Sequence, residues 1–245
     1  MMIPPLHLLD RLRCLSDRTA CNGVIPFERG GEPIEILRQE LTAIGFELMD
    51  WREKPRKGRG EARGTRDLRR CTALLWHQTA TQSMGLSQSL GVPVHAIVHE
   101  RTVILLHPIR AYLYHAGAAN AFSIGVEIVC RAAGLEGDMR TVWTRDGERA
   151  ADVVREATDG QLAAARLLGD YYVAEAPIVA SMYHRNSSSS RVSDPGSRIA
   201  WGVGLRVAEK HGLQHGGPVV GSGKSTPTCW GGALGVPYNW RVRGY

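Results

Sequence analysis

Apolar residues recur along the chain with the helical period in two places, and both places predict amphipathic helices. Residues 33–44 (PIEILRQELTAI) carry four aliphatic side chains on one helical face, with Pro33 in the first turn and Gly45 just past the end. A second helix is expected from residue 158 to about residue 176, because a capping-box pattern begins at Thr158 and a stripe of leucines and tyrosines follows it.

Short apolar runs bounded by polar turns predict the strands of a sheet. These runs read FELMDW (46–51), CTALLWHQTA (71–80), VHAIVHERTVILLHP (94–108), FSIGVEIVCR (122–131) and PIVASMYH (177–184). The third run contains a tight reversal near Glu100–Arg101 and therefore supplies two strands. Helices on a sheet, with polar residues gathered where strands end, indicate an α/β (α+β layered) domain with a central mixed β-sheet flanked by helices.

The chain of 245 residues is long enough for one packed domain with additions at both ends, and we expect it to divide into three parts. Residues 1–70 predict an N-terminal extension, packed on the main domain, that holds the helix at 33–44 and a basic loop at 51–70. Residues 71–205 form the main domain. Residues 206–245 are rich in glycine, proline and tryptophan and predict an irregular tail that covers the main domain.

The net charge of +6 is concentrated in residues 51–70, which carry nine Lys/Arg against three Asp/Glu. The segment is typical of an exposed loop, and its charge also suits attraction to a polyanion such as an anionic wall polymer. Nucleic-acid binding is not expected, because no aromatic residues beyond Trp51 are interleaved with these charges and no helix-turn-helix pattern is present.

No run of about 18 apolar residues is present, so neither a transmembrane helix nor stable membrane insertion is expected. The start, MMIPPLHLLDRLRCLSD, is broken by His7, Asp10 and Arg11 and lacks the apolar core of a signal peptide. We therefore expect synthesis in the cytoplasm without export by that route. Five cysteines without a C-x-x-C pair favour reduced, mostly buried thiols.

Two motifs attract attention and are rejected. His95 and His99 would share a face on a helix, but the apolar run around them favours a strand, so a metal role is not expected there. GSGKST at 221–226 is similar to a phosphate loop, but the first glycine of that pattern is replaced by Pro218 and no strand clearly precedes it.

Four other polar residues suit a catalytic zinc site. His77 ends a strand, while His184 and Asp194 bracket the serine loop in MYHRNSSSSRVSDPG. Two neutral imidazoles and one carboxylate form a common catalytic donor set that leaves one zinc position open for water. A separate carboxylate, Glu127, shares its strand face with Gly125, which leaves room for a substrate, and can accept the proton of that water. Composition alone favours an ordinary structural role for each of the four.

The segments LWHQTA, YHAGAANAFSIGVEI and HRNSSSSRVSDPGSRIAW occur in an informative order. From about residue 71 to residue 201 the chain resembles the zinc-dependent N-acetylmuramoyl-L-alanine amidases of the amidase-2 / peptidoglycan-recognition-protein superfamily. The most specific part is a histidine, nine residues, D-P-G, four residues and a tryptophan. The resemblance implies an amidase-2-like fold and a peptidoglycan or muropeptide substrate. It also implies one Zn²⁺ ion per chain.

The resemblance also implies a role for each residue of the site. His77, His184 and Asp194 are the expected zinc ligands, and Glu127 is the expected catalytic carboxylate. His115 matches a histidine that lines the substrate groove. We therefore expect hydrolysis of the amide bond between N-acetylmuramic acid and L-alanine, in a lytic enzyme similar to an endolysin or a delivered toxin. The alternatives are a cytosolic amidase that recycles anhydro-muropeptides and a recognition module without catalysis.

The chain departs from the family pattern at two positions. Many relatives carry a lysine two residues before the aspartate ligand, where this chain has Val192, and Arg191 or Arg198 would then supply the charge near the substrate. Some relatives use a tyrosine on the strand before the reversal, where this chain has Val94, which leaves more of the proton transfer to Glu127.

Overall fold

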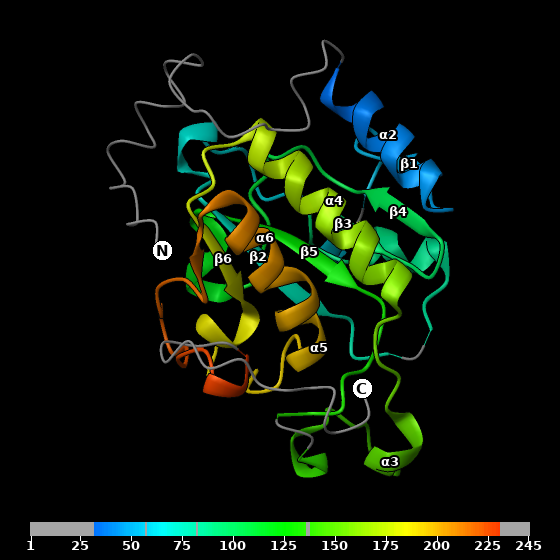
Figure 1. Ribbon diagram of the computed structural model, residues 1–245, viewed down its shortest axis with the longest axis vertical. Helices are drawn as coiled ribbons and strands as arrows, with labels where there is room; N and C mark the ends of the chain where they lie inside the picture. Colours follow the sequence, from blue (N-terminus) through cyan, green and yellow to red (C-terminus); the bar gives the residue numbers. More distant parts are fainter. Residues whose placement is uncertain (1–31, 57, 82, 136–137, 231–245) are drawn as a thin grey trace.

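The computed structural model describes residues 32–230, except for residues 57, 82, 136 and 137. Within these residues, seven strands form one mixed sheet in the order β1-β4-β3-β5-β2-β6-β7 (Figure 1). Neighbouring strands are parallel except for the hairpin of β3 and β4. The strands are β1 (Glu47–Asp50), β2 (Ala73–Gln78), β3 (Ala96–Val98), β4 (Thr102–Leu105), β5 (Ser123–Ile128), β6 (Ala180–Tyr183) and β7 (Gln214–His215).

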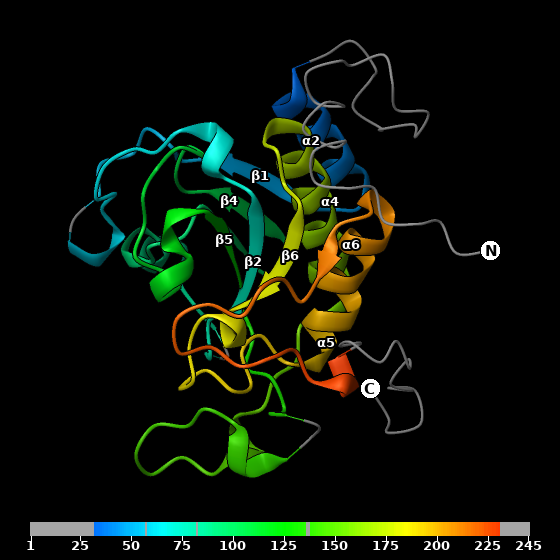
Figure 2. The ribbon, with the colours of Figure 1, turned by 90° about the vertical axis from the view of Figure 1, so that its left-hand side faces the viewer.

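Three helices cover one face of this sheet, as the two views show (Figures 1 and 2). They are α2 (Pro33–Ala43), α4 (Asp159–Glu175) and α6 (Arg206–His211). The predicted capping box at the start of α4 is confirmed, since the Thr158 hydroxyl accepts from the Gln161 amide and the Gln161 side chain accepts from the Thr158 amide. The seven-stranded sheet and the helices that cover it confirm the predicted mixed sheet flanked by helices.

Two further α-helices are short. They are α3 (Ala150–Val153) and α5 (Ser197–Ile199). A π-helical segment, Ala200–Leu205, joins α5 to α6, so that residues 197–211 are helical throughout. The segment that carries α3 projects away from the sheet in both views (Figures 1 and 2).

Strand β2 is buried along its whole length, and its two faces meet different neighbours. Leu74 and Trp76 pack into the large core beneath α4, whereas Ala73 and Leu75 belong to a small cluster on the opposite face. Because side chains alternate along a strand, His77 follows Leu75 onto that opposite face. The sheet thus turns this histidine away from the helices and toward the loops that cover its other side.

The two predicted additions to the main domain contain regular structure. In the first, α2 contacts α4 and β1 joins the sheet beside β4, while most of residues 51–70 lie exposed. In the second, residues 206–215 form α6 and β7, and the chain to residue 227 is irregular apart from turns. The predictions that concern residues 1–31 and 231–245, including the expectation that no signal peptide is present, lie outside the described residues.

Two predictions from composition concern the described residues directly. Cys71 and Cys130 are free and buried. No helix in the described ranges is long and apolar enough to cross a membrane.

Candidate metal centre

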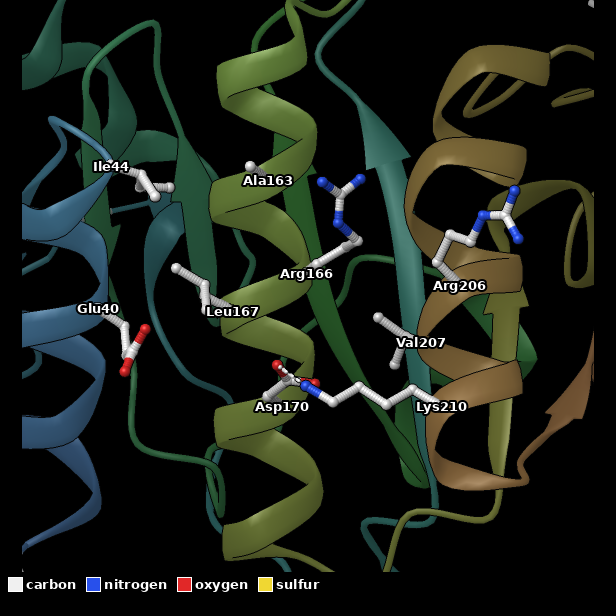
Figure 3. A pocket seen from close by; sticks show the side chains of 9 residues that line it. All are labelled: Glu40, Ile44, Ala163, Arg166, Leu167, Asp170, Arg206, Val207 and Lys210. Carbon is white, nitrogen blue, oxygen red and sulfur yellow. Dashed lines mark hydrogen bonds and ion pairs between the residues drawn. The ribbon is translucent and has the colours of Figure 1, made fainter. Parts of the chain in front are cut away.

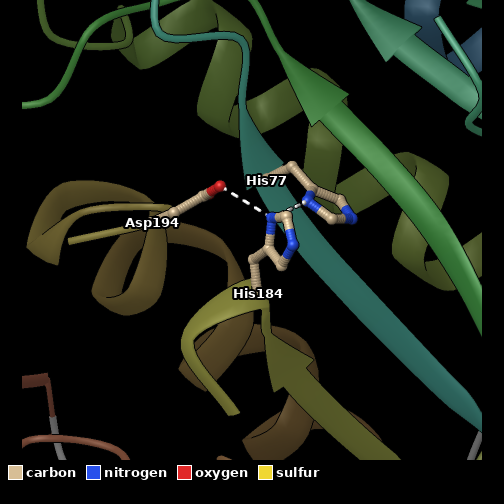
Figure 4. Close-up of side chains that lie close together, drawn as sticks. All are labelled: His77, His184 and Asp194. Atoms are coloured by element: carbon tan, nitrogen blue, oxygen red, sulfur yellow. Dashed lines mark hydrogen bonds and ion pairs between the residues drawn. The ribbon is translucent and has the colours of Figure 1, made fainter. Parts of the chain in front are cut away.

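Three of the predicted site residues meet at the carboxyl ends of two neighbouring strands, β2 and β6 (Figure 4). His77 lies near the end of β2, and His184 directly follows β6, the parallel neighbour of β2. Their Nδ1 atoms are 3.0 Å apart, and Oδ2 of Asp194 lies 2.9 Å from Nδ1 of His184. One donor atom from each residue lies within 4.8 Å of the others. The two ends of the serine loop therefore reach the same point as the end of β2.

These three residues fit a zinc ion. The donor set is two imidazole nitrogens and one carboxylate oxygen, as in catalytic zinc sites with an open fourth position. Metal–donor bonds of about 2.0–2.1 Å in a tetrahedron place neighbouring donors roughly 3.3 Å apart. Two of the three observed separations, 3.0 Å and 2.9 Å, differ from this value by only a few tenths of an ångström, and all three donor atoms lie within 4.8 Å of one another.

Gln78, next to His77, holds the third donor in place. Its backbone N–H donates to Oδ1 of Asp194 over 2.9 Å, which leaves Oδ2 facing the imidazoles. Its side-chain amide donates to the Ser193 carbonyl over 3.1 Å and accepts from the Ala132 amide over 2.7 Å. Such outer contacts orient a ligand before the metal arrives. Gln78 was not predicted from the sequence, because a glutamine beside a histidine has no distinctive spacing.

Residues 216–226 (GGPVVGSGKST) pack along the serine loop and support its shape. The backbone amides of Val220 and Lys224 donate to the carbonyls of Asn186 and Arg185, both over 2.9 Å. A Cβ on Gly223 would collide with the Asn186 carbonyl, so only glycine permits this approach. The glycines that resemble a phosphate loop therefore allow close contact with the loop that carries His184 and Asp194.

Glu127 lies beside the donor set. It is the register partner of His77 in the parallel pair of β5 and β2, so both side chains project from the same face. Its Oε2 is 4.0 Å from Nδ1 of His77, and its side chain is 13% exposed. Burial raises the pKa of Glu127 well above its usual value, and the charge of Asp194 raises it further, while Arg191 acts in the opposite direction. The carboxyl group therefore holds a proton more readily than an exposed glutamate.

The imidazole of His77 is held neutral, which is the form that binds metals. Burial lowers the pKa of His77 well below its usual value, and the neighbouring His184 and His115 lower it further. A neutral ring has one nitrogen with a free lone pair, which the metal requires. The protein environment thus favours the ligand form of this residue.

His115 lies behind His77 and is almost fully buried. Its Nδ1 is 3.0 Å from Nε2 of His77, and its Nε2 is 3.2 Å from the Ser123 hydroxyl. A Cβ on Gly125 would lie 2.5 Å from Nδ1 of His115. The prediction that Gly125 leaves room for a substrate is therefore wrong, because the imidazole of His115 fills that space. Burial, followed by the charge of Arg66, lowers the pKa of His115 to about 3.

The two arginines considered as sources of positive charge differ in their surroundings. Arg198 donates to the Ala157 carbonyl over 2.6 Å and pairs with Asp159 over 2.8 Å, so its guanidinium is already engaged. Arg191 is exposed, and its charge acts on both Glu127 and His77. Arg191 is therefore the arginine near the site.

His95 and His99 flank β3 and have structural partners. Nδ1 of His95 accepts from the Gly125 amide over 3.0 Å, and Nε2 of His99 lies 2.9 Å from the Ser89 hydroxyl. Neither belongs to the one group of metal-donor side chains found in the described part of the chain. Arg66, which the sequence analysis treated as part of an exposed loop, is buried and donates to the Asn120 carbonyl over 2.7 Å.

A cavity of about 590 Å³ lies among α2, α4 and α6 on the helical face (Figure 3). Most of its charged side chains have partners within the protein. Lys210 pairs with Asp170 over 2.7 Å, and Arg166 donates to the Gly202 carbonyl over 2.7 Å. None of its lining residues belongs to the donor set, so the cavity is separate from the metal centre.

Solved structures similar to this chain include N-acetylmuramoyl-L-alanine amidases, endolysins and peptidoglycan recognition proteins. LysC from Clostridium intestinale URNW is 12% identical, with 69% of this chain and 99% of that chain covered and a TM-score of 0.47. AmpDH3 from Pseudomonas aeruginosa is 20% identical, with 66% and 65% covered and a TM-score of 0.43. Drosophila peptidoglycan recognition protein SD is 14% identical, with 71% and 99% covered and a TM-score of 0.44.

No protein-family model matches the chain, and no curated protein matches it either. The chemistry of the site therefore has to be read from the residues of this chain.

Proposed function

We propose that this chain is a zinc-dependent amidase that hydrolyses the amide bond between N-acetylmuramic acid and L-alanine of the peptidoglycan stem peptide. The observation that carries the proposal is the convergence of three metal donors within 4.8 Å, with the Glu127 carboxyl 4.0 Å from one of them. The substrate class comes from the resemblance of the segments that supply these residues to the N-acetylmuramoyl-L-alanine amidases.

His77, His184 and Asp194 would hold the metal ion. A zinc ion in that position supplies Lewis-acid chemistry, which polarises a carbonyl group and lowers the pKa of a bound water to about 7. Glu127 accepts the proton of the attacking water and later donates it to the leaving amine of L-alanine. Its raised pKa suits both steps, since a carboxyl group that holds a proton more readily than an exposed glutamate can take the proton from water and then return it to the amine.

Arg191 provides positive charge for the oxyanion that forms on the carbonyl oxygen. This role replaces the lysine that many relatives carry where this chain has Val192. Removing one such preorganised contact costs about 3–4 kcal/mol in the barrier, which is a loss of a hundredfold or more in rate. An Arg191→Gln variant is therefore expected to retain zinc and to lose most of its turnover.

We assign the enzyme a lytic role on the intact wall. The basic loop at 51–70 supports this role, because its exposed arginines suit an anionic polymer. The assignment predicts faster release of stem peptides from purified sacculi than from soluble anhydro-muropeptides at equal concentrations of cleavable bonds. The reverse order would indicate a recycling amidase.

The decisive experiment measures zinc content and release of stem peptides from purified sacculi, with and without a chelator. The wild type is expected to contain one zinc ion per chain and to release peptides only when it is loaded. Glu127→Gln should keep the zinc and lose turnover, and Asp194→Asn should lose both. Binding to sacculi without release would instead indicate a recognition module, and full activity of Glu127→Gln would disprove its assigned role.

A further inference from the structure

We propose that His115, Ser123 and the carbonyl of Ala119 form a hydrogen-bond chain that keeps the proton of His77 on Nε2 and so presents Nδ1 to the metal. The proposal rests on the proposed function, because it assigns a task to residues behind one of the three metal donors. It makes His115 a positioning residue, in place of the substrate contact that the family resemblance implies.

The direction of the chain follows from its far end, where only one arrangement of hydrogens is possible. The Ala119 carbonyl lies 2.7 Å from the Ser123 hydroxyl and can only accept, so the hydroxyl donates its single hydrogen there. The hydroxyl oxygen must then accept from Nε2 of His115, 3.2 Å away. The proton of the neutral His115 ring is therefore on Nε2.

The same reasoning carries the direction forward to the metal centre. With its proton on Nε2, neutral His115 has a lone pair on Nδ1, which accepts from Nε2 of His77 over 3.0 Å. The neutral ring of His77 then has its lone pair on Nδ1. That atom is the one 3.0 Å from Nδ1 of His184 and 4.0 Å from the Glu127 carboxyl.

The opposite tautomer of His77 is disfavoured on both sides of the ring. Its unprotonated Nε2 would face the unprotonated Nδ1 of His115, so two lone pairs would meet in a buried place without a hydrogen between them. Its protonated Nδ1 would occupy the position that the metal needs. Leaving a buried polar atom without a partner is unfavourable, so the tautomer of His77 with hydrogen on Nε2 is preferred.

Further hydrogen bonds to the backbone hold the hydrogen-bond chain in place. The side-chain oxygen of Asn120 accepts from the amide of His115 over 3.0 Å and from the amide of Ala116 over 2.6 Å. Ser123 is the first residue of β5, the strand that also carries Glu127. On the other side of the metal centre, the Gln78 amide orients Asp194 in the same manner. Two of the three donors are thus oriented by hydrogen bonds with groups outside the donor set.

The test uses a matched pair of substitutions at His115. In His115→Asn the amide oxygen takes the place of Nδ1 and still accepts from His77, whereas His115→Leu has a similar size and no acceptor. Ser123→Ala removes the group that fixes the proton of His115. Zinc affinity is measured by competition with a chelator, and ¹⁵N-histidine NMR of the metal-free protein reports which nitrogen of His77 carries hydrogen.

We expect His77 to be protonated on Nε2 in the metal-free wild type. The zinc dissociation constant should rise about 10–100-fold in His115→Leu and by less than about threefold in His115→Asn, with Ser123→Ala between the two. Circular dichroism and urea unfolding of the metal-free variants establish that each is folded. If a variant does not fold, the wild-type NMR spectrum alone decides the tautomer.

Two results would overturn the proposal. One is protonation of His77 on Nδ1 in the metal-free wild type, and the other is equal zinc affinity of His115→Leu and His115→Asn. Neither result touches the proposed function if the wild type binds zinc and releases stem peptides. Conversely, a wild type without amidase activity would refute the proposed function, while the tautomer of His77 would still decide for or against the hydrogen-bond chain.

Discussion

Gly125→Ala tests whether the imidazole of His115 is held as tightly as the structure indicates. Gly125 lies in the middle of β5 without a positive φ, so alanine suits its backbone. Its new Cβ would lie 2.5 Å from Nδ1, 2.8 Å from Cε1 and 3.0 Å from Cγ of His115. These are atoms of a rigid ring fixed between His77 and Ser123, so no flexible side chain is available to move aside.

The magnitude follows from the distance that the ring must move. Ordinary contact begins near 3.4 Å, so the imidazole of His115 must retreat by about 0.9 Å. Overpacking of this kind costs about 1–3 kcal/mol. If the ring moves away from His77, the unpaired buried N–H adds about 1–3 kcal/mol. Replacing glycine within a strand returns about 0.5–1 kcal/mol. We expect the free energy of unfolding to fall by about 1–5 kcal/mol, depending on how far the ring moves from His77.

The assay is urea unfolding of the metal-free protein, followed by a zinc competition titration. Gly91→Ala is the matched control, because nothing lies within 4 Å of the position that its new Cβ would take and no positive φ is involved, and its effect should stay within about 0.5 kcal/mol. In a His115→Ala background, Gly125→Ala should cost almost nothing. If Gly125→Ala is no more destabilising than Gly91→Ala, the close packing of His115 is refuted.

Three further predictions concern the serine loop, the basic loop and pH. Gly223→Ala should weaken zinc binding about tenfold or more in a chelator titration and should also lower the urea midpoint, because its new Cβ would collide with the carbonyl oxygen of the buried Asn186. Unchanged zinc affinity would contradict this. The basic loop exposes Arg59, Arg63 and Arg70, and replacing all three by glutamine should weaken cosedimentation with sacculi at low salt and reduce the dependence of binding on salt. An unchanged salt dependence would show that the loop does not contribute to binding. Burial, followed by the charge of Arg56, lowers the pKa of His107 to about 4. As the pH drops from about 6.5 toward 4, His107 therefore takes up a proton in the unfolded chain but not in the folded protein, and the free energy of unfolding should fall. In urea unfolding across that range, His107→Gln should show a shallower fall, and an equal slope would contradict the assignment.

The sequence predicted the strands near the site because each is an apolar run with clear polar limits. The predicted runs contain β1 to β6, and the tight reversal falls between β3 and β4 as expected. Strand β7 was not predicted, since Gln214–His215 is polar and its conformation comes from pairing with β6. A strand of two residues has no period to detect.

The helical segment 197–211 was missed because of its glycines. Gly202 and Gly204 lower the helix propensity of the segment. A Cβ on Gly202 would lie 2.7 Å from Leu162 of α4, and a Cβ on Gly204 would collide with Tyr183 of β6. These glycines therefore allow close packing of the helix against its neighbours, which outweighs their low propensity. Contacts between residues that are distant in sequence cannot be predicted from the local residue pattern.

The proximity of His77, His184 and Asp194 was predictable from the family resemblance, because two of them lie in a spaced motif with rare neighbours, D-P-G and a following tryptophan. The groups that orient them were not. Gln78 and Ser123 act through single hydrogen bonds to residues that are distant in sequence. Common polar residues with one long-range partner leave no mark in spacing or composition. The space beside Gly125 was misinterpreted for the same reason, since nothing in the sequence brings His115 there.

The separation of the donors along the chain sets the order of events when the protein folds. His77 and His184 are 107 positions apart and meet only after β2 has paired with β6. A nascent segment around residues 184–194 offers two donors at most and cannot retain the ion well. A zinc ion held by these residues would therefore be captured at the end of folding, after the slow assembly of distant strands. Such an ion would not serve as a nucleus for this fold, and its uptake would report that the centre of the sheet is complete.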